Sequence, residues 1–465
     1  MNEQITESDF GTKPIGKLLM KYSIPCVLSL LINSLYNIVD QIFIGRGVGY
    51  LGNGATNIIF PLTIIAASFG MMFGDGAAAW LSLKSGEGKK EDASKGVVNA
   101  LVMAVILAVI FLIICIIFLK PLLYLFGCTD VIYPYALDYG KIIIIGLPFM
   151  LISTVMGSII RADGSPKYAM STVLVGCVLN IILDYIFVFP MNMGIAGAAL
   201  ATDIGLIVSA VMGLLYISRF KSISVKKEMM KLSFPICGRV CVLGISSFIN
   251  QATTVIVSAL VNNLMRKYGA QSIYGAEIPI TAMGIVMKVN SILIAFLIGI
   301  ASGSQPIVGY NYGAQKYDRV KKTYKIAAVS AMIVAAIGLV IFETQPMLLI
   351  SIFGEENALY NEFACKCFRI FLMLCIGTAF HTVTCIFLQS IGKSIKSAVL
   401  SLARQIILFI PLALILPIYL GLEGVLWAAA LGDGLAFIGA VIFCVIEIRK
   451  INATIVSKRR LAFEN

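Results

Sequence analysis

Charged residues are scarce in this sequence. Asp, Glu, Lys and Arg make up 13% of the 465 residues, whereas an ordinary soluble domain carries about 25%. Hydrophobic residues make up 59%, which argues against a soluble globular protein and predicts an all-α polytopic membrane protein. The net charge of +12 lies in short gaps between hydrophobic runs. It therefore reports membrane topology, and we expect no nucleic-acid partner.

Catalytic and cofactor motifs are also lacking. His381 is the only histidine, so a His-Glu-x-x-His motif cannot be built, and no Walker-type Gly-x-x-x-x-Gly-Lys-Ser/Thr occurs. We therefore expect neither an enzyme nor a transporter driven directly by ATP. Cys365 and Cys367 lack the spacing of a zinc site. Most of the 11 cysteines fall inside apolar runs, where they serve as small buried hydrophobes. We expect no cofactor.

The hydrophobic runs are long enough for twelve transmembrane helices. The first run has no small-residue cleavage site, so we expect it to be retained as a span. Lys and Arg are concentrated in the even-numbered gaps and towards both ends. This bias predicts a multi-pass protein of the cell inner or plasma membrane with both termini in the cytoplasm. The predicted spans are 22–44, 54–80, 97–119, 139–160, 168–189, 195–217, 235–261, 278–303, 324–344, 364–388, 397–419 and 424–447.

The two halves of the sequence repeat each other. Lys21-Tyr-Ser-Ile-Pro25 recurs as Lys231-Leu-Ser-Phe-Pro235, and Gly194-Ile-Ala-Gly197 recurs as Gly421-Leu-Glu-Gly424. Six spans per half is an even number, so both halves enter the membrane from the same side and are related by an axis along the membrane normal. We predict an N-lobe (1–218), a cytoplasmic linker (219–231), a C-lobe (232–450) and a basic cytoplasmic tail (451–465).

Two six-helix lobes around a cleft are typical of transporters, and several motifs sharpen this interpretation. With the repeat, the chain resembles the multidrug and toxic compound extrusion (MATE) family over about residues 14–450. The motifs that carry the resemblance are Asp40 before Phe43 and Gly45, Gly-rich segments from Gly74 to Gly86 and from Gly299 to Gly313, Arg161-Ala-Asp-Gly-Ser-Pro-Lys167, Asn180-Ile-Ile-Leu-Asp-Tyr185, and the segment from Gly194 to Thr202.

The resemblance implies secondary active efflux. Such a protein exports bulky, often cationic drugs in exchange for Na⁺ or H⁺ by alternating access. The expected partners are small organic substrates and membrane lipids, and we expect a monomer. The alternative within the same superfamily is a flippase for lipid-linked oligosaccharide or peptidoglycan precursors. A flippase would be expected to show a strongly cationic cavity and often more than twelve spans.

A few polar residues at membrane depth are candidates for the coupling site. Asn180 and Asp184 are four residues apart on one face of span five, and Asp40 follows Tyr36 and Asn37 on span one. Two carboxylates, a carboxamide and the Thr202 hydroxyl of span six form an all-oxygen set. A hard cation such as Na⁺ prefers oxygen ligands, while two close carboxylates can instead share a proton.

The resemblance assigns cation coupling to Asp40, Asn180, Asp184 and Thr202. The simpler alternative is that each residue makes an ordinary helix–helix polar contact. The repeat argues against this alternative for the acids, since Asp40 stands opposite Asn250 and Asp184 opposite Pro411. The second half thus folds without these two charges.

Other polar or flexible residues give weaker signals. Met287 and Lys288 of span eight are candidates for the substrate cavity, together with Tyr36 and Asn37. Asp75, within a Gly-Asp-Gly segment, stands opposite Ser302 in the repeat, and we interpret it first as structural. Asp203 is close to Thr202 but on a different helix face. His381 we interpret as a packed polar residue.

Overall fold

The computed structural model describes residues 8–275, 277–353 and 358–464, and within these ranges the chain is helical with no strand. The helices are α1 (Ser8–Thr12), α2 (Ile15–Gly47), α3 (Tyr50–Gly86), α4 (Lys90–Leu125), α5 (Tyr133–Ala162), α6 (Pro166–Val188), α7 (Gly194–Leu215), η1 (Tyr216–Arg219), η2 (Lys227–Met230), α8 (Phe234–Gly269), α9 (Glu277–Gly313), α10 (Tyr317–Thr344), α11 (Pro346–Phe353), α12 (Ala358–Phe371), α13 (Cys375–Ser390), α14 (Ser394–Leu402), η3 (Ala403–Phe409), α15 (Ile410–Leu420) and α16 (Leu422–Glu464).

The twelve predicted spans are confirmed, one of them as a broken helix. Among the described residues, eleven helical segments are long and apolar enough to cross a membrane. The tenth span is the pair α12 and α13, which meet at an angle of 47°. The eleventh joins α14, the π-helical stretch η3 and α15. The last helix, α16, does not end with its apolar run near residue 447 and continues to Glu464 without a proline to break it.

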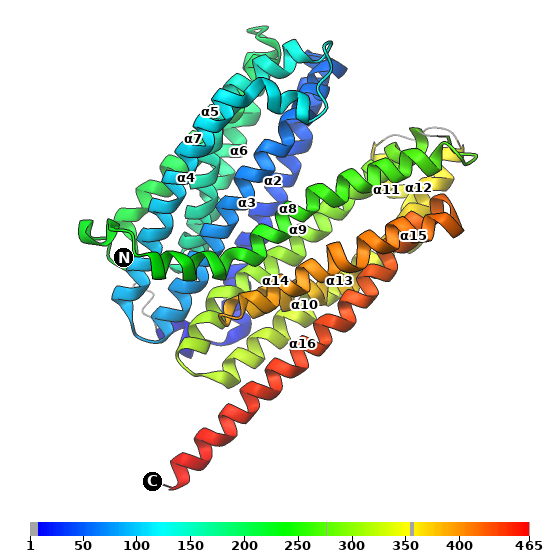
Figure 1. Ribbon diagram of the computed structural model, residues 1–465. Coiled ribbons are helices and arrows are strands. Elements are labelled where there is room, and N and C mark those ends of the chain that lie inside the picture. The colour runs from blue at the N-terminus through cyan, green and yellow to red at the C-terminus, as the bar shows by residue number, and fades with distance from the viewer. Residues whose placement is uncertain (1–7, 276, 354–357, 465) are drawn as a thin grey trace.

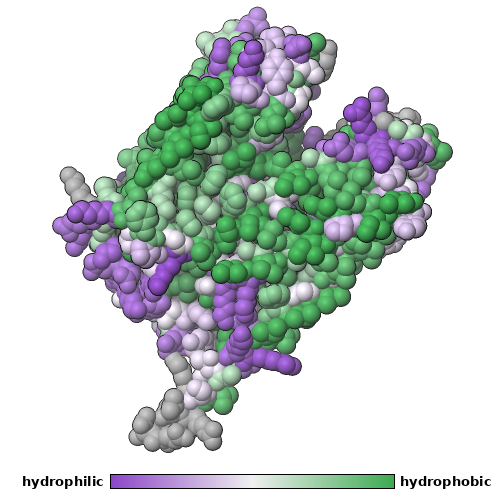
Figure 2. Space-filling model, in the orientation of Figure 1, coloured by the Kyte–Doolittle hydropathy of each residue, from purple (hydrophilic) through white to green (hydrophobic). Residues whose placement is uncertain are grey.

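The helices form two lobes that diverge towards one end of the molecule (Figure 1). Helices α2–α7 build one lobe and α8–α16 the other. Figure 2 shows a hollow between the lobes at the diverging end, which we call the open end, and hydrophobic side chains covering the middle of the visible face. At the opposite, closed end α2 packs against α9 and α3 against α8. Under the repeat α2 corresponds to α8 and α3 to α9, so the repeat converts one pair into the other, as predicted for parallel repeats.

The beginning of the chain crosses the closed end and packs on the C-lobe. Phe10 of α1 and Leu18, Leu19 and Tyr22 of α2 are buried in a core whose other buried residues belong to the C-lobe. Asn311 Nδ2 donates to the carbonyl of Phe10 (3.0 Å), and Arg319 Nη2 donates to the same carbonyl (2.9 Å). The later half of α2 contributes Ile44 to an N-lobe core. Helix α2 is therefore shared between the two lobes.

The segment between the lobes is held by the N-lobe at both of its ends. At its start, Asp163 accepts hydrogen bonds from the backbone of Lys221 (2.9 Å) and of Ser222 (2.9 Å) and from the Tyr216 hydroxyl (2.8 Å). Burial raises the pKa of Asp163, and these hydrogen bonds oppose the rise. At its end, Asn99 Nδ2 donates to the carbonyl of Met229 (3.1 Å). The predicted linker, 219–231, is thus an anchored segment.

Replacing Asp163 with alanine is expected to release the start of this segment. Each hydrogen bond to a charged group contributes about 1.5–3 kcal/mol, so trypsin cleavage after Lys221 should become at least about tenfold faster. The measurement is limited proteolysis of the detergent-solubilised protein. Asp130→Ala is the control, because this exposed acid lies in the loop between α4 and α5 and accepts a hydrogen bond from the nearby Tyr124. Equal cleavage rates for Asp163→Ala and the wild-type protein would contradict the prediction.

Candidate functional site

Two acids from different helices meet inside the N-lobe, near its open end. Asp40 lies seven residues before the end of α2 and Asp184 four residues before the end of α6. Asp40 is 9% exposed and Asp184 is fully buried. Their carboxyl groups lie close enough for the charge of one to act on the other. Two carboxylates at this separation repel each other unless a proton or a cation lies between them.

Asn180 and Thr202 complete the set of oxygen ligands. Asn180 lies one turn before Asp184 on α6 and is 2% exposed. Its Nδ2 donates to Oγ1 of Thr202 on α7 at 3.2 Å. The structure therefore brings together the four residues assigned to cation coupling.

Several oxygens of this cluster have no hydrogen-bond donor. Within the described residues, Oδ1 of Asp40, Oδ1 of Asn180 and both carboxylate oxygens of Asp184 are buried without a partner. A buried acceptor without a donor costs about 1–3 kcal/mol, and more when it is charged. These orphaned oxygens fit a small cation or a shared proton, either of which would satisfy them.

Two tyrosines and a third acid surround the cluster. Tyr36 of α2 lies against Thr202 and close to both Asp40 and Asp184. Tyr139 of α5, 7% exposed, is close to the same acids and to Asp203. Asp203 is 4% exposed and packs on Gly146 of α5, where an added Cβ would lie 2.0 Å from its Oδ1. Tyr139 was not predicted from the sequence, although a tyrosine hydroxyl at membrane depth needs a polar partner.

In the corresponding region of the C-lobe the acid is paired with a basic side chain of the same lobe. Asp433 of α16 pairs with Arg404 of η3 at 2.8 Å and accepts from Oγ1 of Thr378 at 2.7 Å. Asn250, the repeat counterpart of Asp40, accepts from Nε2 of Gln405 at 2.9 Å. In the part of the chain that the structure describes, neither Asp40 nor Asp184 forms an ion pair with Lys, Arg or His. The unpaired acids are therefore a feature of the N-lobe.

The remaining candidates lie outside this cluster. Asn37 is exposed and donates to the carbonyl of Asn33 (2.7 Å), so it does not join Asp40. Lys288 is exposed on α9 in the C-lobe, and Met287 packs against the C-lobe core. His381 is buried beside the carbonyl of Leu400 (3.3 Å), consistent with a packed polar residue.

The groups of this cluster that could bind a cation are all oxygen atoms. No group of three or more His, Cys, Asp or Glu side chains suited to a metal ion occurs among the described residues. A cation at Asp40 and Asp184 would find further oxygen ligands in the neighbouring side chains, among them Asn180 and Thr202. Such a set suits a hard cation and not a transition metal.

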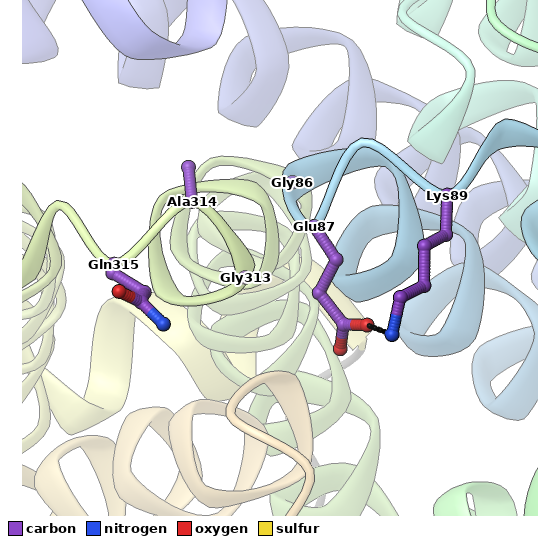
Figure 3. Close-up of a pocket in the computed structure, with 6 residues that line it drawn as sticks. All are labelled: Gly86, Glu87, Lys89, Gly313, Ala314 and Gln315. Atoms are coloured by element: carbon purple, nitrogen blue, oxygen red, sulfur yellow. Dashed lines mark ion pairs between the residues drawn. The ribbon is translucent and has the colours of Figure 1, made fainter.

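A pocket of about 420 Å³ opens at the closed end, far from the acids along α3 (Figure 3). Glu87 and Lys89, which form an ion pair of 3.1 Å, line it from the loop after α3. Gly313, the last residue of α9, and Gln315, in the loop that follows, line it from the C-lobe. The two loops correspond to each other in the repeat, so the pocket marks the place where the lobes meet.

Comparison with known proteins identifies the family. The family model MatE matches residues 25–186 and 243–415, one stretch in each half of the chain. The chain belongs to the MatE family. This confirms the resemblance inferred from the sequence, and the two matched stretches follow the two halves of the repeat. The relatives that match this chain are named as multidrug export proteins, and two of the matching solved structures are named as transporters.

Relatives of this MatE chain match over nearly the whole length. The multidrug export protein MepA of Staphylococcus saprophyticus is 23% identical over 442 residues, covering 93% of this chain and 94% of MepA. MepA of Staphylococcus haemolyticus is 24% identical over 434 residues, covering 91% and 92%.

Solved structures show the same fold. An outward-facing multidrug resistance MATE family transporter has a TM-score of 0.89 at 22% identity, covering 97% of this chain and 100% of that one. A MOP superfamily transporter from Pyrococcus furiosus, described as having a binding pocket of reverse polarity, also has a TM-score of 0.89, at 21% identity and with the same coverage.

Proposed function

We propose that this MatE protein is an efflux antiporter that exports bulky organic compounds, often cationic, in exchange for Na⁺ or H⁺. The observation that carries the proposal is the pair of buried acids, Asp40 and Asp184, with orphaned oxygens and no cationic partner in the described chain. The names of the MepA relatives, multidrug export proteins, support the substrate class. The basic loops of the closed end support a cytoplasmic orientation for that end and for both termini.

The proposed mechanism couples the charge state of the acids to alternating access. A cation or proton at Asp40 and Asp184 removes their repulsion and satisfies the orphaned oxygens. The helices that carry them, α2 and α6, then pack differently from the unloaded state. Because α2 also packs in the C-lobe core, such a change reaches both lobes. The coupling free energy is the difference in cation affinity between the two states, and a few kcal/mol suffices.

Neutralising either acid is expected to reduce ion-driven transport strongly. Asp40→Asn and Asp184→Asn each remove one carboxylate and its affinity for a cation or proton. In proteoliposomes with ethidium as the probe, gradient-driven ethidium movement should fall at least about tenfold, the effect of losing about 1.4 kcal/mol of coupling. Separate Na⁺ and pH gradients show which ion is exchanged.

The matched control is Asp138→Asn on α5. Asp138 is exposed, so this variant removes a carboxylate from the same lobe without touching the buried cluster. It should transport at the wild-type rate. If Asp40→Asn and Asp184→Asn keep wild-type exchange with either ion, the assignment of the coupling site fails.

A further inference from the structure

The lobes touch closely where α3 crosses α8 at the closed end. A Cβ added to Gly76 of α3 would lie 2.2 Å from the carbonyl oxygen of Val240. A Cβ added to Gly244 of α8 would lie 1.7 Å from the carbonyl oxygen of Met72. Glycine at both positions lets the two backbones meet directly, as small residues do between membrane helices. Any opening of this end must separate these two helices.

Asp75, next to Gly76, accepts one hydrogen bond from each lobe. Ser158 of α5, in the N-lobe, donates to Oδ1 at 2.8 Å. Ser247 of α8, in the C-lobe, donates to Oδ2 at 2.8 Å. A second contact joins the lobes here, because Nε2 of Gln305 on α9 lies 3.4 Å from the backbone carbonyl oxygen of Asp75. The carboxylate thus joins the two lobes at their crossing.

Each serine that donates to Asp75 itself accepts a hydrogen bond from a group that can only donate. Arg161 Nη2 donates to the Ser158 hydroxyl (2.8 Å), and Gln389 Nε2 of α13 donates to the Ser247 hydroxyl (3.2 Å). Guanidinium and amide N–H groups only donate, so each serine hydroxyl is left to donate towards Asp75. The two series of hydrogen bonds, one from Arg161 and one from Gln389, therefore both end on the carboxylate of Asp75, which only accepts. Hydrogen bonds to a charged acceptor are the stronger kind.

The related crossing of α2 with α9 has no such charge. There the Ser23 hydroxyl lies 3.3 Å from the carbonyl oxygen of Ile300, and Gly303 packs against the backbone of Ser23. The repeat places Ser302 opposite Asp75. Close helix contact at the closed end is therefore achieved without an acid, and the carboxylate has a role beyond packing.

We propose that Asp75 is a positioning residue for transport: its carboxylate latches the closed end through Ser247 of the opposite lobe and sets the balance between closed and open forms of that end. The latch goes beyond the proposed function, because it does not depend on which ion or compound is carried. Opening the closed end breaks the bond between Asp75 and Ser247, whereas the bond to Ser158 can remain within the N-lobe.

The test compares two neighbouring serines. Ser247→Ala removes the side-chain bond from α8 to Asp75, and Gln389, which loses the same hydroxyl, keeps its bond to the carbonyl of Leu243 (2.9 Å). Ser246→Ala is the matched control, since the Ser246 hydroxyl is buried and bonds to Ser397 within the C-lobe (2.6 Å). Spin labels at Glu91→Cys and Lys322→Cys, exposed positions near the starts of α4 and α10, report the separation of the lobes at the closed end. The partly exposed cysteines Cys177, Cys241 and Cys365 are first replaced with alanine.

Ser247→Ala is expected to raise the ratio of open to closed forms roughly tenfold, seen by pulsed electron resonance as a larger population at long distance without any ion gradient. Asp75→Asn should act in the same direction, and if it fails to fold, Ser247→Ala still carries the test. In ethidium transport, Ser247→Ala should lower the KM for ethidium at the closed-end face. It should also raise the ion concentration that is needed at the open-end face to drive transport.

An unchanged distance distribution in Ser247→Ala, or an equal shift in Ser246→Ala, would overturn the latch. The distance measurement uses neither ions nor substrate. It can therefore fail while the coupling site of Asp40 and Asp184 stands, and it can succeed even if that site is wrongly assigned.

Discussion

A single methyl group at position 244 is expected to force the lobes apart at the closed end. In Gly244→Ala the new Cβ would stand 1.7 Å from the carbonyl oxygen and 2.6 Å from the carbonyl carbon of Met72. Both atoms are backbone, so no side chain can turn away to make room. Overpacking of this kind costs about 1–3 kcal/mol, borne only while α3 and α8 are together. Transport should fall roughly ten- to a hundredfold, and the distance between labels at positions 91 and 322 should increase.

Gly238→Ala is the control on the same helix. No atom lies within 4 Å of a Cβ added there, while the gain in helix propensity from Gly to Ala, about 1 kcal/mol, is the same at both positions. Gly238→Ala should therefore transport like the wild-type protein. If Gly244→Ala also transports at the wild-type rate with an unchanged distance, then α3 and α8 are not in obligatory contact during the cycle.

Hydropathy predicted the spans because each helix must cross the same apolar thickness, and the repeat predicted how the halves are related. Two features escaped this reasoning. The bend of 47° between α12 and α13 lies inside one continuous apolar run. Hydropathy shows that such a run crosses the membrane but does not show where its helix axis bends. The attachment of Phe10 to the C-lobe depends on Asn311 and Arg319, about 300 residues away. Only the folded chain brings such partners together.

The candidate site was predicted from residue chemistry more than from position. Asp40 and Asp184 were conspicuous because a charge at membrane depth is expensive. Their neighbours were harder to choose, because spacing along one helix does not show which face is buried. Asn37 lies three residues from Asp40 yet is exposed and bonds to Asn33. Tyr139 stands in the cluster, although nothing in its local sequence points to α2 or α6.

Asp75 is another residue whose partner could not be predicted from the sequence. The sequence suggested only a structural role for it, and did not predict that the neighbouring Gly76 meets the backbone of α8. The partner across that contact, Ser247, is one of many serines in the sequence. Serine at membrane depth is unremarkable alone, since its hydroxyl can bond to its own helix. Only the crossing of the helices distinguishes Ser247, which reaches the other lobe, from Ser246, which stays within its own.

The second large effect is expected at the closed end of the C-lobe, where Glu447 of α16 is fully buried. Lys393, just before α14, and Lys396, within it, both donate to its carboxylate, and their side chains are 29% and 34% exposed. Replacing both lysines with methionine leaves a buried carboxylate without a cation. Breaking a buried ion pair from one side costs about 3–5 kcal/mol, so the double variant should lose much of its resistance to thermal unfolding in detergent.

The single variants separate this effect from a general loss of surface charge. In Lys393→Met or Lys396→Met one lysine still pairs with Glu447, so each should destabilise far less than half as much as the double variant. Adding Glu447→Gln to the double variant should restore stability, because a buried amide is much less costly than a buried charge. If the two single effects simply add, or if Glu447→Gln gives no rescue, the two lysines do not share the carboxylate. α14 and α16 would then be joined at this end by apolar packing alone.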